Sequence, residues 1–171
     1  MSNSPWLSLS DAIATMLNQT QPVGVSEQTD VKTAVGRVLA SPVVASLNVP
    51  PCNNSAMDGY ALKSSDGQAG NSLEVVGAVF AGDSRSPTVI AGQCVRIMTG
   101  APLPADCDAV IIQENVTRED NIITLQTDTA EMANVRETGS DIARGDQLFN
   151  TGHRVTATDT MLLSSLGLAK V

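Results

Sequence analysis

The period of the hydrophobic residues changes along this 171-residue chain, from helical near both ends to strand-like in between. From Asn48 to about Glu137, short apolar segments alternate with Gly, Pro, Asn and Asp, which is typical of strands separated by turns. The clearest predicted strands are 73–76, 95–98, 109–112 and 122–125. The segment 109–112 is apolar throughout, so we expect it to be the most buried. We expect 135–136 to close this sheet.

Helical signals are confined to the two ends of the chain. Ser8 with Asp11, and Thr156 with Asp159, have the spacing of capping boxes, and each pair precedes apolar residues at helical spacing. Weaker patterns predict helical residues at 34–39 and short strands at 27–31 and 42–45. The sequence therefore predicts an α+β protein. A β-rich domain (49–138) is inserted within a discontinuous mixed α/β outer domain (1–48 plus 139–171).

Composition excludes several classes of partner. Aromatic residues are only 2% of the chain and the net charge is −8, so stacking of single-stranded nucleic acid and attraction to phosphates or anionic lipid are disfavoured. We expect no nucleic-acid partner and no membrane partner. No apolar run approaches the roughly 18 residues of a spanning helix, and the first residues do not resemble a signal peptide, so a cytoplasmic location is expected. The three cysteines are widely spaced and are expected to be reduced thiols.

One loop combines stiff residues with a carboxylate. Pro50 and Pro51 restrict the chain before Asp58, which precedes a glycine and a predicted strand. An Asp-Gly pair commonly does no more than form a turn. A rigidly held Asp58 could equally hold Mg²⁺ through oxygen or orient a water molecule.

Two further segments carry candidate binding residues. Thr99 and Gly100 follow a predicted strand, where they form either a plain connection or a loop whose backbone approaches a ligand closely. Arg136 and Asp141 form either a solvated ion pair, worth at most about 1 kcal/mol, or a site for an anionic group. His153 has no assigned role.

Two blocks of sequence point to a family. The stretch 55–61 reads S-A-M-D-G-Y-A, and the stretch 96–104 reads R-I-M-T-G-A-P-L-P, followed by an acidic strand region. In this order they resemble the signatures of the MoeA family, the molybdopterin molybdenumtransferases related to the E domain of gephyrin. The segment 134–141 is similar to the family's N-x-R-x-x-G-x-D pattern.

This resemblance implies a transferase of molybdenum cofactor biosynthesis. Family members insert molybdate into adenylylated molybdopterin with a divalent cation, normally Mg²⁺, and their site lies between two subunits of a homodimer. By resemblance, Asp58 and Thr99 are the catalytic residues, with Thr99 placed to contact the ligand's phosphates. Ser55, Gly100, Arg136 and Asp141 are the substrate-binding residues implied. No residue is assigned as a metal ligand.

The chain departs from the family pattern in two places. Cys52-Asn53 stands where the pattern usually has Phe-Asp, and the sequence ends at Val171, where family members continue into a nucleotide-type α/β domain. We therefore expect this chain to carry part of the active site and to be inactive by itself. The alternative is a non-catalytic dimerisation or partner-binding module on the same scaffold.

Overall fold

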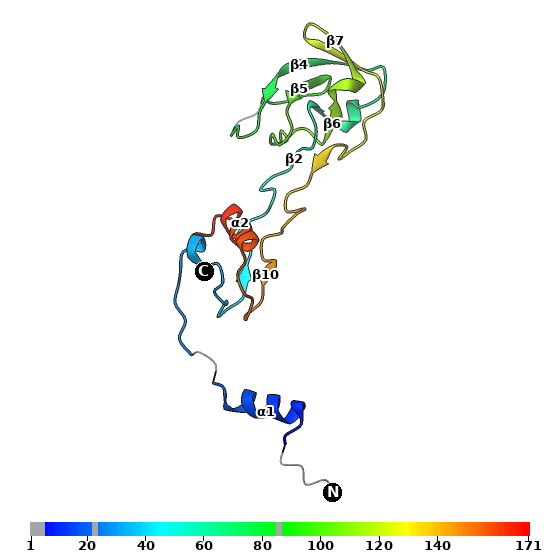
Figure 1. Ribbon diagram of the computed structural model, residues 1–171. Helices are drawn as coiled ribbons and strands as arrows, with labels where there is room; N and C mark the ends of the chain where they lie inside the picture. The colour runs from blue at the N-terminus through cyan, green and yellow to red at the C-terminus, as the bar shows by residue number, and fades with distance from the viewer. Residues whose placement is uncertain (1–5, 22–23, 85–86) are drawn as a thin grey trace. The chain divides into compact units, whose positions relative to one another are not determined.

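The structure is a computed structural model that describes residues 6–21, 24–84 and 87–171 (Figure 1). Its contacts divide the chain into two compact units, Met1–Ala40 with Gly152–Val171, and Ser41–Thr151. The strand pair β1 (Val43–Val44) and β10 (Gln147–Phe149) therefore lies within the second unit. The domain limits at 48/49 and 138/139 remain a prediction from the sequence.

A six-stranded mixed sheet dominates the second unit (Figure 1). Its strands are β3 (Gly59–Leu62), β4 (Ser72–Val79), β5 (Gln93–Ile97), β6 (Ala109–Ile112), β7 (Val116–Glu119) and β8 (Ile122–Leu125). They lie in the order β6-β3-β5-β4-β8-β7, with β4 and β5 parallel and the other neighbours antiparallel. The four clearest predicted strands are confirmed, and the α+β class with them. Strand β7 escaped prediction because it is an edge strand of mostly exposed residues.

Apolar side chains are buried on both faces of the sheet. On one face the buried cluster consists of Tyr60, Leu62, Leu73, Cys94, Ala109, Ile111, Ile123 and Leu125. On the other face it consists of Ala61, Val79, Val89, Val95, Ile97, Ala101, Cys107 and Val110. Because successive residues of a strand point to opposite faces, β3 and β6 contribute to both clusters and are almost fully buried. This explains how a core can form with so few aromatic residues.

The predicted closure of the sheet by 135–136 is wrong. These residues form β9 (Val135–Arg136), which pairs with β2 (Asn54–Ser55) in a separate two-stranded sheet. Asn134 has a φ of 54°, and its side-chain amide donates to the carbonyl of Val110 on the edge strand β6. The chain thus covers the edge of the sheet before it turns away towards β2.

Two short 3₁₀ helices connect the strands of the sheet. They are η2 (Ser64–Asp66), which follows β3, and η3 (Gln113–Asn115), which follows β6. Asp108 stabilises the first of these, because its carboxylate accepts from the backbone N–H and the hydroxyl of Ser64.

The first unit joins residues from both ends of the chain. Helix α1 (Leu9–Gln19) begins at the predicted N-cap, Ser8, and buries none of its residues. The helix predicted at 34–39 is wrong: a single 3₁₀ turn, η1 (Val31–Thr33), ends before Gly36, whose φ is 84°. Backbone hydrogen bonds then pair 36–39 with 152–155. The strand predicted at 27–31 is reduced to an isolated bridge between Asp30 and Lys170.

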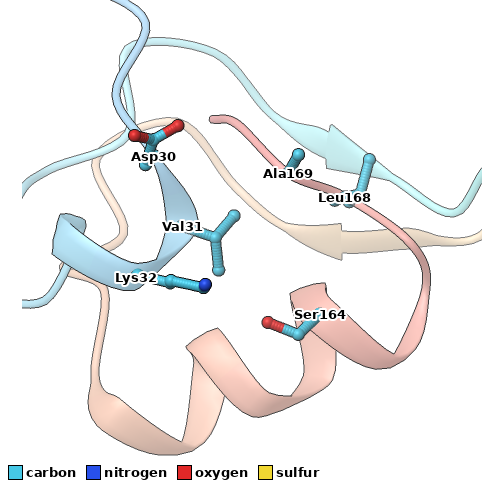
Figure 2. A pocket seen from close by; sticks show the side chains of 6 residues that line it. All are labelled: Asp30, Val31, Lys32, Ser164, Leu168 and Ala169. Atoms are coloured by element: carbon cyan, nitrogen blue, oxygen red, sulfur yellow. The ribbon is translucent and has the colours of Figure 1, made fainter.

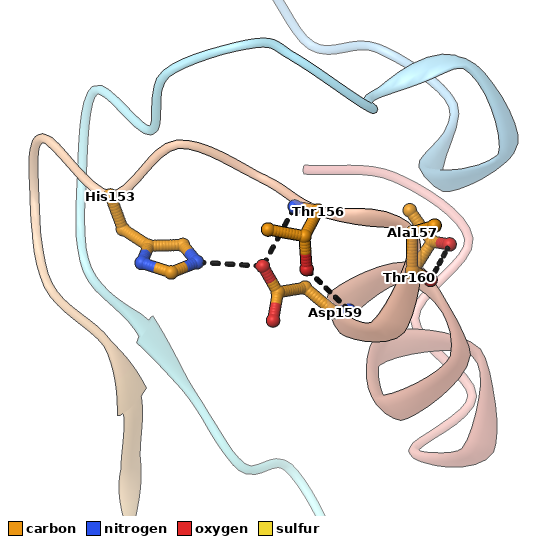
Figure 3. A network of polar contacts seen from close by, with 5 residues as sticks. All are labelled: His153, Thr156, Ala157, Asp159 and Thr160. Atoms are coloured by element: carbon orange, nitrogen blue, oxygen red, sulfur yellow. Dashed lines mark hydrogen bonds and ion pairs between the residues drawn. The ribbon is translucent and has the colours of Figure 1, made fainter.

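Helix α2 (Ala157–Ser165) has the predicted capping box (Figure 3). The Thr156 hydroxyl accepts from the Asp159 N–H at 3.3 Å, and the Asp159 carboxylate accepts from the Thr156 N–H at 2.8 Å. The same Asp159 oxygen lies 2.7 Å from Nε2 of His153. Gly167, with a φ of 73°, follows the helix as expected of a C-terminal cap. None of the helices within the described residues is long and apolar enough to cross a membrane.

Candidate functional site

Asp58 and Thr99 lie in direct contact. The backbone N–H and the hydroxyl of Thr99 both donate to Oδ1 of Asp58, each at 2.8 Å. Asp58 is partly exposed and Thr99 is exposed. Among the residues that the structure describes, none donates to the second carboxylate oxygen, Oδ2. One oxygen therefore holds the two loops together, and the other is available to a ligand or a water molecule.

The register of two strands explains this contact. Strand β3 runs antiparallel to β5 with Gly59 opposite Ile97, so the residue before β3 lies near the residues after β5. Gly59 is required at this junction, because a β-carbon there would lie 2.0 Å from the carbonyl oxygen of Ile111 on β6. The close approach of β3 to β6 thus fixes the position from which Asp58 projects.

Arg96 supports Asp58 from the neighbouring strand. Its guanidinium donates to the carbonyl of Gly59 at 2.9 Å and to Oε1 of Gln113 at 2.5 Å, and it lies 5.2 Å from the centre of the Tyr60 ring. Gln113 in turn donates its backbone N–H to the carbonyl of Asp58. Alternation along the predicted strand 95–98 places Arg96 on the face opposite Val95 and Ile97, and the sequence by itself indicates no role for it. Its contacts depend on the pairing of Tyr60 with Arg96, which only the folded sheet shows.

These contacts favour the ionised form of Asp58. The backbone hydrogen bond from Thr99 lowers the pKa of Asp58 most, followed by the hydrogen bond from the Thr99 hydroxyl, and the charge of Arg96 lowers it further. Asp58 is therefore a carboxylate at neutral pH. It can accept a proton or a hydrogen bond, and it is poorly suited to donate one.

In the loop after β5, the backbone N–H groups already donate to acceptors within this chain. Gly100, with a φ of 80°, donates its N–H to the carbonyl of Ser55 at 2.8 Å, and Ala101 donates to the carbonyl of Met98 at 2.9 Å. Since Thr99 donates to Asp58, no N–H from 99 to 101 is free to receive a phosphate. The Thr99 hydroxyl also donates its proton to Asp58, so it can offer a phosphate only its oxygen. A phosphate oxyanion is itself an acceptor and does not use a second acceptor.

Ser55 lies in the interior rather than at the surface. It is fully buried, and its hydroxyl donates to the Met57 carbonyl at 2.5 Å and accepts from the Met57 N–H at 3.3 Å. Its backbone pairs with Val135 on one side and bonds to Gly100 and Ala101 on the other. Ser55 thus connects the Asp58 loop with the Thr99 loop, while its side chain is buried and bonded to the backbone of Met57.

Arg136 and Asp141 form an ion pair, which is one of the two arrangements expected from the sequence. Nη2 of Arg136 lies 2.6 Å from Oδ2 of Asp141, and both side chains are about half exposed. Arg136 stands opposite Asn54, whose Oδ1 is buried without a hydrogen-bond partner among the described residues. Strand β2 therefore lies between this ion pair and the Thr99 loop, since Asn54 also bridges Pro102.

The described residues do not form a metal centre by themselves. Among them, no three His, Cys, Asp or Glu side chains gather closely enough to hold a metal ion. Asp58 and Asp141 therefore do not belong to such a group. Cys94 and Cys107 are buried free thiols whose pKa values burial raises to about 12, so they are poor metal ligands and poor nucleophiles.

A pocket of about 290 Å³ lies in the first unit (Figure 2). It is lined by Asp30, Val31, Lys32, Ser164, Leu168 and Ala169. None of the site residues predicted from the sequence lies there. The pocket therefore adds nothing to the chemistry of the Asp58 loop.

Comparison with known proteins decides the family. Residues 7–167 match the model of the MoeA N-terminal region (domain I and II). The chain belongs to the MoeA family. It is 39% identical over 96% of its length to the molybdopterin molybdenumtransferase of Haemophilus influenzae, and 36% identical over 79% of its length to that of Synechococcus elongatus. These matches cover 41% and 35% of the two relatives, so the chain spans less than half of their length.

Solved structures agree with this family assignment. The fold is similar to the crystal structure of the molybdopterin biosynthesis moeA protein from Pyrococcus horikoshii OT3, with a TM-score of 0.88 and 32% identity. That match covers 95% of this chain and 44% of the Pyrococcus chain. The two recognised sequence blocks thus belong to a MoeA-type N-terminal region in both sequence and fold.

Proposed function

We propose that this MoeA-family chain supplies part of the site at which molybdate is inserted into adenylylated molybdopterin. The Asp58–Thr99 contact is the observation that carries the proposal, because it places an ionised carboxylate with a free oxygen at the surface end of a rigid sheet. The names of the relatives, molybdopterin molybdenumtransferases, support the reaction class. The pathway is then molybdenum cofactor biosynthesis.

The chemistry assigned to Asp58 follows from its charge state. A carboxylate that accepts hydrogen bonds can orient a water molecule towards the adenylate phosphorus, or accept a hydrogen bond from the pterin. Thr99 acts in this proposal by holding Asp58. Arg136, with Asp141 orienting it, is the residue proposed to receive an anionic group, because a guanidinium matches phosphate geometry. Gly100 and Ser55 contribute backbone positions.

The remaining parts of the site are proposed to come from elsewhere in the enzyme. We propose a homodimer in which the cofactor domain of a second subunit faces this sheet, with Mg²⁺ held by ligands beyond the described residues. The enzyme is proposed to act in the cytoplasm. The 171-residue chain should then bind the adenylylated ligand weakly and should not insert molybdate.

Two measurements on matched variants test the proposal. Titration of the chain with adenylylated molybdopterin should shift the NMR signal of the Thr99 amide, and D58N should weaken binding while E131Q, a change at an exposed carboxylate, should not. Molybdate insertion should be undetectable with the chain alone. Turnover by the chain alone, or unchanged binding by D58N, would contradict the proposed site.

A non-catalytic dimerisation module is the second candidate, favoured by helix α1. Its apolar residues Leu9, Ile13, Met16 and Leu17 are all exposed, which leaves a continuous apolar face for a second copy of this chain. The double variant I13E/M16E should lower the apparent mass in sedimentation if this face pairs two copies. Ligand binding discriminates the candidates, since a module without chemistry would not respond to D58N.

A further inference from the structure

We propose that Arg96 is a positioning residue for Asp58 and supplies the positive charge that allows a carboxylate to lie beside an anionic ligand. The electrostatic part of this proposal rests on the proposed function, because that function makes the ligand anionic. For the placement of Asp58 the proposal rests only on contacts within this chain. The two parts are therefore separable by experiment.

The backbone at Asp58 is held on both sides through Arg96. The guanidinium donates to the carbonyl of Gly59, the next residue, and to the side chain of Gln113, whose backbone N–H donates to the carbonyl of Asp58. One side chain therefore connects β5, the start of β3 and η3. Loss of Arg96 would remove two bonds, one to the residue that follows Asp58 and one to the residue whose N–H donates to the Asp58 carbonyl.

The shape of the Arg96 contacts calls for a guanidinium. Two different nitrogens donate to two different acceptors, while the planar group lies over the Tyr60 ring. Lysine could keep the charge, but its single nitrogen cannot reproduce this fork and stack together. Tyr60 is 4% exposed, so the surface on which Arg96 rests is part of the rigid core.

The charge of Arg96 is not cancelled by an acid. Both acceptors of its guanidinium, the Gly59 carbonyl and the Gln113 side chain, are neutral, and among the described residues no carboxylate lies within ion-pair distance of it. The net charge of the chain is −8, so an anionic ligand approaching Asp58 would otherwise meet repulsion. A preorganised cation held by neutral groups offsets part of that repulsion.

Arg118 provides a matched control. It also contacts Tyr60, donating to the phenol oxygen at 3.4 Å, but it donates in addition to the Asp120 carbonyl on the β7–β8 turn. Substitution of Arg118 therefore removes one cation beside the same ring without removing a bond to the Asp58 loop. The variants R96Q, R96K and R118Q separate the charge of Arg96 from its geometry.

The first measurement is an NMR titration of the Asp58 carboxyl carbon in the full chain, with thermal unfolding to confirm that each variant is folded. R96Q should raise the pKa of Asp58, R96K should raise it less, and R118Q should leave it unchanged. R96K should also speed hydrogen exchange of the Gln113 amide, because one anchor of that segment is lost. If R96Q does not fold, the comparison of R96K with R118Q still tests the positioning role of Arg96. An Asp58 pKa and a Gln113 exchange rate that do not respond to Arg96 would overturn the positioning role.

The second measurement is the affinity of the folded variants for adenylylated molybdopterin. R96Q should bind about tenfold more weakly than the wild type, and R118Q should bind within about twofold of it. Equal affinities for R96Q and the wild type would overturn the electrostatic role. Failure of the wild type itself to bind would refute the proposed function, and the titration would still decide whether Arg96 positions Asp58.

Discussion

Thr99 donates both its backbone N–H and its hydroxyl to the same oxygen of Asp58, at 2.8 Å each. The two residues are 41 positions apart in the sequence and meet because the start of β3 lies beside the end of β5. The contact converts two exposed loops into one rigid edge. It also leaves Oδ2 of Asp58 without a donor among the described residues, and Oδ2 is the oxygen that the proposed function assigns to the ligand or a water molecule.

The contribution of the Thr99 hydroxyl can be measured directly. T99V should raise the pKa of Asp58, because one of the two hydrogen bonds that favour the carboxylate is lost, whereas T99S should keep it close to the wild-type value. Because the folded pKa of Asp58 lies below its ordinary value, the stability that these two hydrogen bonds contribute is fully present above the unfolded pKa. It is lost as pH falls through the folded pKa. Carboxyl NMR titration checks the order of the three proteins, and equal pKa values in T99V and T99S would contradict it.

Gly59 should not tolerate a side chain. In G59A the new β-carbon would lie 2.0 Å from the Ile111 carbonyl oxygen, so β3 and β6 would have to separate. We expect a loss of about 3 kcal/mol in the free energy of unfolding. Urea denaturation measures it, with G24A as the control, since nothing lies within 4 Å of a β-carbon there. A G59A protein as stable as G24A would show that the sheet adjusts locally.

Some of this architecture could be predicted from residue patterns and some could not. The run 109–112 is apolar throughout, so its strand was predicted to the residue, whereas β7 has polar exposed residues and left no alternating signal. The helix predicted at 34–39 failed because Ala34 and Leu39 are buried by tertiary contacts, with Gly36 at positive φ between them. Helical spacing of apolar residues therefore does not distinguish a helix from an irregular segment that tertiary contacts bury.

The candidate site shows the same division. The family blocks identified Asp58 and Thr99 as separate candidates, but their hydrogen bonds follow from strand register, which residue types do not specify. Arg96 was placed on the correct face by alternation, yet its partners Gly59 and Gln113 come from two other segments. Ser55 was predicted to bind substrate from its place in the motif, and burial shows that its side chain serves the backbone instead.

Exchange of Asn53 for the aspartate of the family pattern should change the stability of the protein little. Its Oδ1 accepts from the backbone N–H of Thr138 at 2.9 Å and from the Thr138 hydroxyl at 3.0 Å, two bonds that an aspartate oxygen could also accept. N53D should therefore change the free energy of unfolding by less than about 0.5 kcal/mol. N53A should cost about 1–2 kcal/mol because both donors lose their partner. Urea denaturation compares the variants, and equal stabilities of N53A and N53D would show that the two bonds from Thr138 to Asn53 do not stabilise the protein.

The Arg136–Asp141 pair should matter for binding and little for stability. Both side chains are about half exposed, so R136A should change the free energy of unfolding by less than about 1 kcal/mol. If Arg136 receives an anionic group, R136A should lower the affinity for adenylylated molybdopterin, and R136K should restore only part of it. Calorimetric titration and urea denaturation of the same samples separate the effects. A large loss of stability with unchanged affinity would leave the pair as a structural feature of the turn.

The capping box of α2 should make the first unit sensitive to acid (Figure 3). The hydrogen bond with His153 lowers the pKa of Asp159 most, followed by the bond from the Thr156 N–H. A carboxyl with a depressed folded pKa stabilises the protein above its unfolded pKa, and that stability is lost as pH falls through the folded value. D159N should therefore flatten the loss of stability on the acid side.

The hydroxyl half of the same box gives a separate prediction, at neutral pH. T156A should cost about 1 kcal/mol, because the Asp159 N–H at the start of α2 loses its acceptor, while T156S should keep that bond. Thermal unfolding of the two variants and D159N from neutral to acidic pH measures both effects. A loss of stability in T156A that T156S does not show at neutral pH would assign the capping bond to the hydroxyl, and a reduced acid slope in D159N would assign the pH dependence to the carboxylate. An acid slope unchanged in D159N would place the acid sensitivity in another group.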